Sequence, residues 1–376
     1  MGSDDRQSVE VTNPIFGSLK ASGLKYPCTL RWQDLDNNST RTPLYPQEES
    51  QMKKHPQPQR RAILLGSAAT LLLPKLAFGQ AKQTVRVGVP TKTYFPTIIA
   101  ETAIRQKLFD KEGINCELTI YRSGSEGFEA LAAGAADLVF NSSSSVAAGL
   151  VKGVKSKCVA NGGNGYYGWH MMVKPDSPIK KLSELAGKKV GITSAGSGTD
   201  MLARWAMANE KREFTRVPLG GGGLLPNLLT GNIDATVLYS PLTYQVMQAK
   251  QARSIADFGE LVPAHSTGSW IASDKIIGER PQALQKALNA LYGGLAYLRA
   301  PQNRAAAVKL IAEIDEIPEP IAAAELDGNI VKLSTTGEFR KEWMERALDM
   351  ARLIGMKDLA PVEQIYVSNF RPVPTT

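Results

Sequence analysis

Side chains that commonly hold metal ions are scarce in this sequence. Its 376 residues include only three cysteines and three histidines, and these form neither a Cys-x-x-Cys pair nor a Cys/His cluster. Structural zinc sites are built from such clusters, so we expect no metal and no cofactor. Cys116 and Cys158 are either a disulfide pair or two small buried thiols, and the second interpretation is favoured.

The residue patterns of common enzymes are missing as well. No Ser-His-Asp set surrounds a nucleophile elbow, no two carboxylates share a loop, and Gly220–Gly223 lacks the Gly-Lys-Ser/Thr ending of a P-loop. Gly196 and Gly198 match two glycines of a dinucleotide-binding fingerprint, but Met201 stands where the third is needed. We therefore predict that the protein is not an enzyme, with an NAD-dependent oxidoreductase as the weakest alternative.

Charge is not concentrated in one place along the chain. The net charge is +8, from 44 Lys and Arg against 36 Asp and Glu, and the densest basic cluster lies at 53–61. This distribution argues against a nucleic-acid partner, although a modest positive balance suits small anions. With 43% hydrophobic and 21% charged residues, the composition is that of a soluble globular protein and not of a polytopic membrane protein.

The first 81 residues divide into two segments that differ from the rest. Residues 1–51 are rich in Asn, Asp, Ser, Thr, Gln and Pro and have no sustained period, which is typical of disorder. Residues 52–81 begin with basic residues, continue with an apolar run too short to span a bilayer, and end with Ala77 and Gly79 in small-x-small spacing. We interpret 52–81 as a signal peptide and 1–51 as a non-native upstream extension of the reading frame.

This interpretation places the mature protein in the periplasm. Arg60-Arg61 resembles a twin-arginine export signal, but flanking residues of the full motif are absent. Sec export and twin-arginine export therefore both stay open. We expect the mature chain to begin between Gln80 and Lys82.

After residue 84 the sequence repeats one α/β plan twice. Short β-branched runs alternate with segments of helical spacing, which predicts parallel sheets with right-handed crossovers. The first copy has strands at 85–90, 116–121 and 137–140 and helices at 98–108 and 127–133; the second has strands at 189–193, 215–219 and 235–238 and helices at 201–209 and 224–230. In both copies a glycine, Gly134 or Gly231, ends a helix three residues before an aspartate that begins a strand. The remainder predicts amphipathic helices at 281–299, 303–314, 319–331 and 337–353.

Five short motifs in this order carry a family resemblance. They are Val85-Arg-Val-Gly-Val89, Phe109-Asp-Lys-Glu-Gly-Ile114, Ala130-Leu-Ala-Ala-Gly-Ala-Ala-Asp137, Leu182-Ser-Glu-Leu-Ala-Gly-Lys-Lys-Val-Gly191 and Gly231-Asn-Ile-Asp-Ala235. Together they resemble the periplasmic solute-binding proteins of ABC importers for nitrate, sulfonate, taurine and thiamine precursors. The resemblance covers residues 84–300.

The resemblance implies a type II periplasmic-binding-protein fold, in which two α/β lobes are joined by a hinge of two crossings. On this basis residues 82–172 form the first part of lobe I, 173–265 form lobe II, and 266–376 complete lobe I with the C-terminal helices. We place the crossings near 170–173 and 266–271. The implied partners are a small-molecule ligand and the permease and ATPase of an importer in the inner membrane, and we expect a monomer.

The candidate site follows from a rule for open α/β sheets, whose ligands bind beyond the carboxyl ends of the strands. The rule selects the loops 91–97, 122–126, 141–145, 194–200 and 239–241, with 220–223 beside them. These loops carry hydroxyls, glycines and aromatic rings, which suit an organic anion or a neutral polar molecule: a sulfonate, a carboxylate, nitrate or a pyrimidine-like compound. The candidate ligand-binding residues are Tyr94, Phe95, Arg122, Asn141, Ser142, Ser143, Trp169, Ser194, Gly196, Ser197, Gly198, Thr199, Gly222, Tyr239, Ser240 and Trp270.

Several of these candidates have two interpretations. The hydroxyls and backbone N–H groups at 194–200 suit an anionic group, while one hydroxyl is enough simply to cap a helix. Arg122 and His170 are candidates for a positive charge, and His265 is a weaker one. Tyr94 and Tyr239 rank first among the aromatic residues, on the expectation that they occupy equivalent loops of the two lobes. We predict hinge closure around the ligand, and a sensor for a membrane receptor, which would share this fold, stays open as the alternative to transport.

Overall fold

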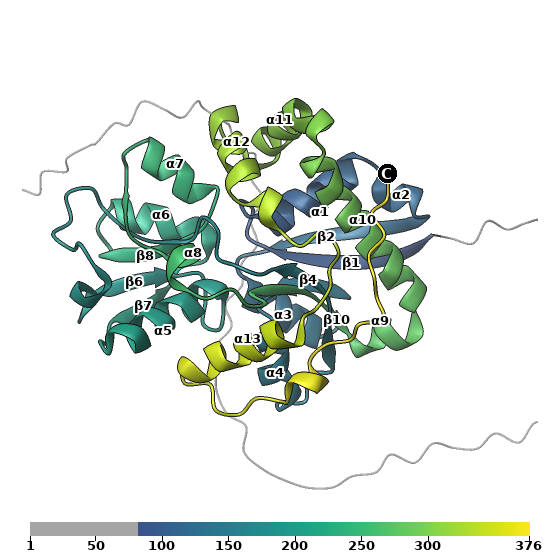
Figure 1. The fold of residues 1–376 in the computed structure, drawn as a ribbon, viewed down its shortest axis with the longest axis horizontal. Helices are drawn as coiled ribbons and strands as arrows, with labels where there is room; N and C mark the ends of the chain where they lie inside the picture. The colour runs from purple at the N-terminus through teal and green to yellow at the C-terminus, as the bar shows by residue number, and fades with distance from the viewer. Residues whose placement is uncertain (1–81) are drawn as a thin grey trace, which may run out of the picture. The chain divides into compact units, whose positions relative to one another are not determined.

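Two five-stranded sheets organise residues 82–376, the part of the chain that the computed structural model describes (Figure 1). The predictions for 1–51 and 52–81 lie outside this range. The first sheet contains β1 (Gln83–Pro90), β2 (Ile114–Tyr121), β3 (Leu138–Asn141), β4 (Ser156–Gly163) and β10 (Gly268–Ser273) in the order β2-β1-β3-β10-β4. The second contains β5 (His170–Val173), β6 (Lys189–Ile192), β7 (Thr215–Pro218), β8 (Ala235–Leu238) and β9 (Arg253–Asp257) in the order β7-β6-β8-β5-β9. Lobe I is built on the first sheet and lobe II on the second.

Each sheet has four strands that run in one direction and one strand, β10 or β5, that runs in the opposite direction. β1 pairs in parallel with β2 and β3, and β6 with β7 and β8, as the repeated plan predicts. β10 runs antiparallel between β3 and β4, and β5 runs antiparallel between β8 and β9. The sequence does not predict these strands, because β4 is rich in small residues and β5 is buried at every position, so neither shows the alternation of a half-buried strand.

The chain passes between the sheets twice, each time earlier than predicted. The first passage is at 164–169, so the prediction of a crossing at 170–173 is wrong: those residues form β5 and pair with β8. Gly168, with φ of +71°, supports the backbone turn that leads into β5. The second passage is at 262–267, and most of the predicted crossing at 266–271 belongs to β10.

Helices accompany both sheets. Lobe I has α1 (Phe95–Arg105), α2 (Leu108–Lys111), α3 (Gly124–Ala132), α4 (Ser144–Leu150), α9 (Asp274–Glu279), α10 (Pro281–Arg299), α11 (Arg304–Asp315) and α12 (Glu319–Gly328), and lobe II has α5 (Gly198–Glu210), α6 (Gly221–Leu229), α7 (Leu242–Gln248) and α8 (Phe258–Leu261). α10 occupies its predicted range, because Pro281 suits the first position of a helix. Across residues 82–376, no helix has both the length and the apolar character that a membrane crossing requires.

The C-terminal helix α13 (Lys341–Leu353) contacts both lobes. Met344 and Leu348 pack in a cluster with Ile271 of the first sheet, whereas Met350 and Ile354 join the hydrophobic core of lobe II. Figure 1 shows α13 between α4 of lobe I and α5 of lobe II. The two lobes are therefore joined by this shared helix in addition to the two passages, which the sequence does not predict.

Cys116 and Cys158 are free thiols, as favoured from the sequence. They lie on β2 and β4, the two edge strands of the first sheet, four strand spacings or roughly 19 Å apart. A disulfide bond cannot reach across that distance. Burial raises the pKa of both thiols to about 12, so they stay protonated at neutral pH.

Candidate functional site

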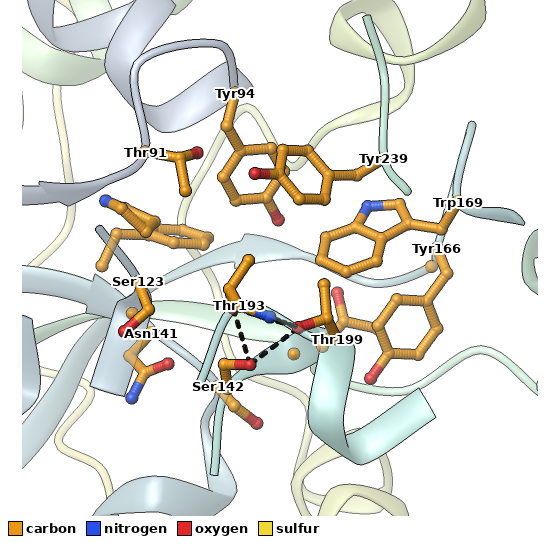
Figure 2. A pocket seen from close by; sticks show the side chains of 17 residues that line it. Thr91, Tyr94, Ser123, Asn141, Ser142, Tyr166, Trp169, Thr193, Thr199 and Tyr239 are labelled. Carbon is orange, nitrogen blue, oxygen red and sulfur yellow. Dashed lines mark hydrogen bonds between the residues drawn. The ribbon is translucent and has the colours of Figure 1, made fainter. Parts of the chain in front are cut away.

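A small cavity of about 50 Å³ lies where the carboxyl ends of the parallel strands of both lobes meet (Figure 2). Five of the six loops selected from the sequence contribute to it, together with the two passages between the lobes. Its lining residues are Pro90, Thr91, Tyr94, Ser123, Gly124, Phe140, Asn141, Ser142, Gly165, Tyr166, Trp169, Thr193, Ser197, Gly198, Thr199, Tyr239 and Thr267. The cavity is therefore built jointly by the two lobes.

One wall of the cavity is aromatic. The ring centroid of Tyr94 lies 5.1 Å from that of Tyr239 and 5.6 Å from that of Trp169, and Trp169 and Tyr239 are 5.1 Å apart. Tyr166 adds a fourth ring, 5.6 Å from Trp169. Figure 2 shows these rings gathered on one side of the cavity. Tyr94 follows β1, the first strand of the repeated plan, whereas Tyr239 follows β8, the third strand of that plan, so the expectation that they occupy equivalent loops is wrong.

Hydroxyl groups of lobe II form a second wall at the start of α5. Thr199 Oγ1 accepts a hydrogen bond from Thr193 N at 2.8 Å, and Thr193 Oγ1 donates to Ser197 Oγ at 2.8 Å. Ser197 is also the N-cap of α5, because its side chain accepts a hydrogen bond from Asp200 N. The helix-cap interpretation thus holds for Ser197, and the same side chain lines the cavity beside Gly198 and Thr199.

Lobe I contributes polar groups from the loops after β2 and β3. Ser123 caps α3, and its Oγ accepts a hydrogen bond of 2.8 Å from Ser194 Oγ, which joins the two lobes directly. Asn141 Nδ2 donates to Ser145 Oγ at 3.0 Å. A side chain at Gly124 would place its Cβ 2.4 Å from Asn141 Oδ1, so glycine is required for this close approach.

Three hydroxyls of the lining are buried without a hydrogen-bond partner of good geometry: Thr91 Oγ1, Tyr166 OH and Tyr239 OH, and the side chains of Thr91 and Tyr239 lie close to each other. The three hydroxyls come from lobe I, the first passage and lobe II respectively. Burial raises the pKa of Tyr239 to about 12 and raises the pKa values of Tyr94 and Tyr166 as well. All three phenols are therefore neutral hydrogen-bond donors at ordinary pH.

The lining carries no Lys, Arg, His, Asp or Glu. The partial positive charges of two helix N-termini face acidic side chains of the chain itself. Glu126, in the first turn of α3, accepts from Arg122 N at 2.7 Å, and Asp200, in the first turn of α5, accepts from Gly196 N at 2.9 Å and pairs with Arg216. Within residues 82–376, His, Cys, Asp and Glu form no group of three that would hold a metal ion. The cavity is thus polar but carries no formal charge.

Several predicted site residues lie behind the lining and support it. Phe95 packs under Tyr94 with ring centroids 4.6 Å apart, and Trp270 packs behind Phe140 at 5.3 Å. Ser143 Oγ is hydrogen-bonded to Ser269 Oγ at 2.7 Å, and Ser240 Oγ accepts from Asn329 Nδ2 at 3.1 Å. These positions do not line the cavity, because their strands or loops turn the side chains into the protein.

The remaining predicted residues lie away from the cavity. The Arg122 side chain is 85% exposed and pairs with Glu126, and Gly222 borders an outer groove. Gly196 forms the turn before α5 with φ of +74°, and Ser194 lies outside the lining on the seam between the lobes. The two histidines are structural: His170 Nδ1 is bonded to Ser254 Oγ and His265 Nδ1 to Pro263 O, and burial lowers the pKa of each.

Sequence reasoning missed nine lining residues. Thr91, Ser123 and Thr193 are early polar residues after β1, β2 and β6, so their position relative to the strand ends was an available signal. Tyr166 lies in the first passage, which the sequence places too late. The others are Pro90, Gly124, Phe140, Gly165 and Thr267.

Comparisons with known proteins agree on this architecture. The model of the family described as NMT1/THI5 like matches residues 96–305. A Bacillus subtilis protein named for binding aliphatic sulfonates is 24% identical, with a match over 75% of this chain and 88% of that protein. The alkanesulfonate-binding protein SsuA from Xanthomonas axonopodis, solved bound to MOPS, is 16% identical and covers 75% of this chain and 98% of its own, with a TM-score of 0.65. The nitrate-binding protein NrtA from Synechocystis is also 16% identical, covers 66% and 70%, and has a TM-score of 0.54. The chain therefore belongs to the NMT1/THI5-like family and has the fold of the periplasmic sulfonate- and nitrate-binding proteins.

Proposed function

We propose that the protein is the exported solute-binding component of an ABC importer and that it captures a small, uncharged polar molecule between its lobes. The observation that carries this proposal is the set of three unpartnered hydroxyls, Thr91, Tyr166 and Tyr239, in one cavity. The names of the relatives support the binding role, since they are binding proteins. The partners would be a permease and its ATPase.

The unpartnered hydroxyls favour a ligand that accepts hydrogen bonds. A buried donor without a partner costs about 1–3 kcal/mol, and a ligand oxygen or ring nitrogen would remove that cost. Because Thr91 belongs to lobe I and Tyr239 to lobe II, one ligand bonded to both would hold the lobes together. Such a ligand favours the closed form only by its extra affinity for it.

An uncharged ligand fits this lining better than an anion. An anion would lose its hydration without meeting a cation, and the N-termini of α3 and α5 already face Glu126 and Asp200. The aromatic wall of Tyr94, Trp169 and Tyr239 suits a flat or apolar body. Among the ligand classes that the sequence suggests, a pyrimidine-like molecule therefore fits better than a sulfonate, a carboxylate or nitrate.

A thermal-shift panel tests both parts of this proposal. The mature chain is heated with nitrate, acetate, MOPS and uracil in turn, and a compound at one hundred times its Kd adds about 2.7 kcal/mol of stability. We expect stabilisation by the neutral pyrimidine and none by the three anions. Stabilisation by an anion alone would refute the uncharged class, and no stabilisation by this panel or by a wider set of small solutes would refute the binding role.

Removing single hydroxyls locates the ligand. Tyr166→Phe and Tyr239→Phe should weaken binding of the stabilising compound by about 0.5–1.5 kcal/mol in calorimetry, without lowering ligand-free stability, because neither hydroxyl has a partner in the protein. Tyr292→Phe is the matched control. Its buried hydroxyl donates to Asn161 O at 2.6 Å, outside the cavity, so this change should lower stability and leave affinity unchanged.

A further inference from the structure

Two carboxylates are buried at the contact between the C-terminal helices and lobe II. Asp315, the last residue of α11, is 4% exposed, and Glu325 of α12 is fully buried. Both oxygens of Asp315 and Oε2 of Glu325 have no hydrogen-bond partner. An ionised carboxylate that is buried without hydrogen-bond donors destabilises the protein, because it loses its hydration without compensation. The burial of this pair therefore calls for an explanation.

The side-chain amide of Asn329 connects Glu325 to Ser240 of lobe II by two hydrogen bonds. Glu325 Oε1 accepts from Asn329 Nδ2 at 2.8 Å, and the same Nδ2 donates to Ser240 Oγ at 3.1 Å. Ser240 follows β8 and is adjacent to Tyr239 of the cavity. α12 also packs against α7 of lobe II, where a side chain at Gly328 would collide with the hydroxyl of Tyr244. The carboxylate pair therefore lies where lobe I meets lobe II.

The groups around the pair provide little positive charge. Lys92, from the loop after β1, is the one cation that acts on Asp315, and its Nζ is already paired with the exposed Glu316 at 2.5 Å. The other ionisable neighbours are phenols: Tyr94 of α1's N-cap, Tyr239 after β8 and Tyr244 of α7.

The remaining charges on α11 and α12 do not compensate the pair. Glu313 pairs with Arg105 of α1, and Arg304 pairs with Asp327, all at exposed positions. Lys309 and Glu319 are exposed as well. The buried carboxylates thus meet one shared cation and three neutral hydroxyls.

Burial raises the pKa of Glu325 to about 7 and that of Asp315 to about 8, and the neighbouring Glu325 charge contributes to the shift of Asp315. Both pKa values are raised above those of the hydrated carboxyls. The stabilisation of the packed form is therefore complete below about pH 4 and is lost as the pH rises through about 7 to 8.

We propose that Asp315, Glu325 and Asn329 form a proton-dependent latch between lobe I and Ser240 of lobe II. When the carboxyls are protonated they tolerate burial, and the Glu325–Asn329–Ser240 contact holds the lobes closed. When they ionise, hydration of the charges favours separation of α12 from lobe II. The consequence for ligand capture rests on the proposed function, because the latch controls access to that cavity, whereas the lobe motion itself does not depend on a ligand.

Small-angle scattering of the ligand-free mature chain between about pH 6 and about pH 9 tests the latch. We expect the radius of gyration to increase with pH, because ionisation of the two carboxyls favours the open form. Glu325→Gln keeps the shape of a protonated carboxyl and an acceptor for Asn329, so it should stay compact throughout. Asp315→Asn should shift the transition to higher pH or remove it. Glu319→Gln is the matched control and should behave as the unmodified chain, because Glu319 is exposed in the first turn of α12.

Circular dichroism at both ends of the pH range verifies that each variant is folded. An unmodified chain whose radius does not change with pH would overturn the latch, as would full opening of both Glu325→Gln and Asp315→Asn. The thermal-shift panel is independent of this readout. A pH response without any bound compound refutes the proposed function alone, and a bound compound without a pH response refutes the latch alone.

Discussion

The loops after β1 and β6 occupy equivalent positions in the two lobes, and each carries two threonines six residues apart. In lobe I, Thr97 Oγ1 donates to the carbonyl of Thr91 at 2.6 Å, and Thr91 Oγ1 is left without a partner. In lobe II, Thr199 Oγ1 accepts from Thr193 N and the two hydroxyls bond to each other at 3.0 Å. The same spacing therefore builds a rigid wall in lobe II and leaves a free hydroxyl in lobe I. The repeated α/β plan therefore determines the positions of these hydroxyls in the sequence. It does not determine which of them are free to bond to a ligand.

Aromatic residues give the largest contrast between the lobes. Tyr239 of lobe II is 2% exposed, whereas Tyr94 of lobe I is partly exposed. Tyr239→Ala should lower the free energy of unfolding by about 3–5 kcal/mol because it leaves a void in a packed core, and Tyr94→Ala should lower it by less. Denaturant unfolding of the ligand-free variants measures both. If both variants lose the same free energy of unfolding, the two rings contribute equally to stability and the difference in their exposure has no energetic effect.

The threonine wall of lobe II should show an intermediate effect. Thr199→Val leaves the buried N–H of Thr193 unpaired, which should cost about 1–3 kcal/mol in the same unfolding measurement. Thr102→Val is the control, since Thr102 is fully buried and its Oγ1 has no partner. That change should be neutral or stabilising. A loss at Thr102 as large as that at Thr199 would show that shape, and not hydrogen bonding, determines stability here.

The free hydroxyl of lobe I should show the smallest effect on stability. Thr91→Val removes a group without a partner, so the free energy of unfolding should stay within about 0.5 kcal/mol of the original value or rise. Affinity for the compound found in the thermal-shift panel should fall, because the ligand loses a donor. Calorimetry on the folded variant gives the second value. Unchanged affinity would remove Thr91 from the proposed contacts.

Much of the fold was predictable because its strongest signals are local. α10 was predicted at 281–299, and the three parallel strands of each sheet follow from β-branched runs next to helical spacing. The other two strands of each sheet, β4 and β10 in lobe I and β5 and β9 in lobe II, were not predicted, because they lack the local pattern and pair with residues far along the chain. Misplacing β5 moved the first passage and with it Tyr166. An error of a few residues in the predicted position of a passage is therefore enough to exclude a lining residue from the predicted site.

The site was predictable at the level of loops and not of single side chains. The strand-end rule selected the loops that line the cavity, yet Phe95 packs beneath Tyr94 although the two are adjacent in sequence. Trp169 and Trp270 both lie close to a passage, but only Trp169 reaches the cavity, while Trp270 is held inside by β10. The direction of each ring depends on a strand: β5 begins directly after Trp169, and β10 contains Trp270. The sequence predicts neither of these strands.

The shared helix α13 restricts the kind of movement that is available to the lobes. Met344 and Leu348 are anchored in one lobe and Met350 and Ile354 in the other, so sliding one lobe along the other would pull apolar side chains into water. Exposing a buried side chain of this size costs about 1.5–3 kcal/mol. A rotation about an axis near α13 keeps all four in place, because points close to an axis hardly move. Ser266 N donates to Trp343 O at 3.2 Å, which fastens the second passage to the same helix. The contacts of α13 therefore favour rotation of one lobe about this helix over sliding of one lobe along the other.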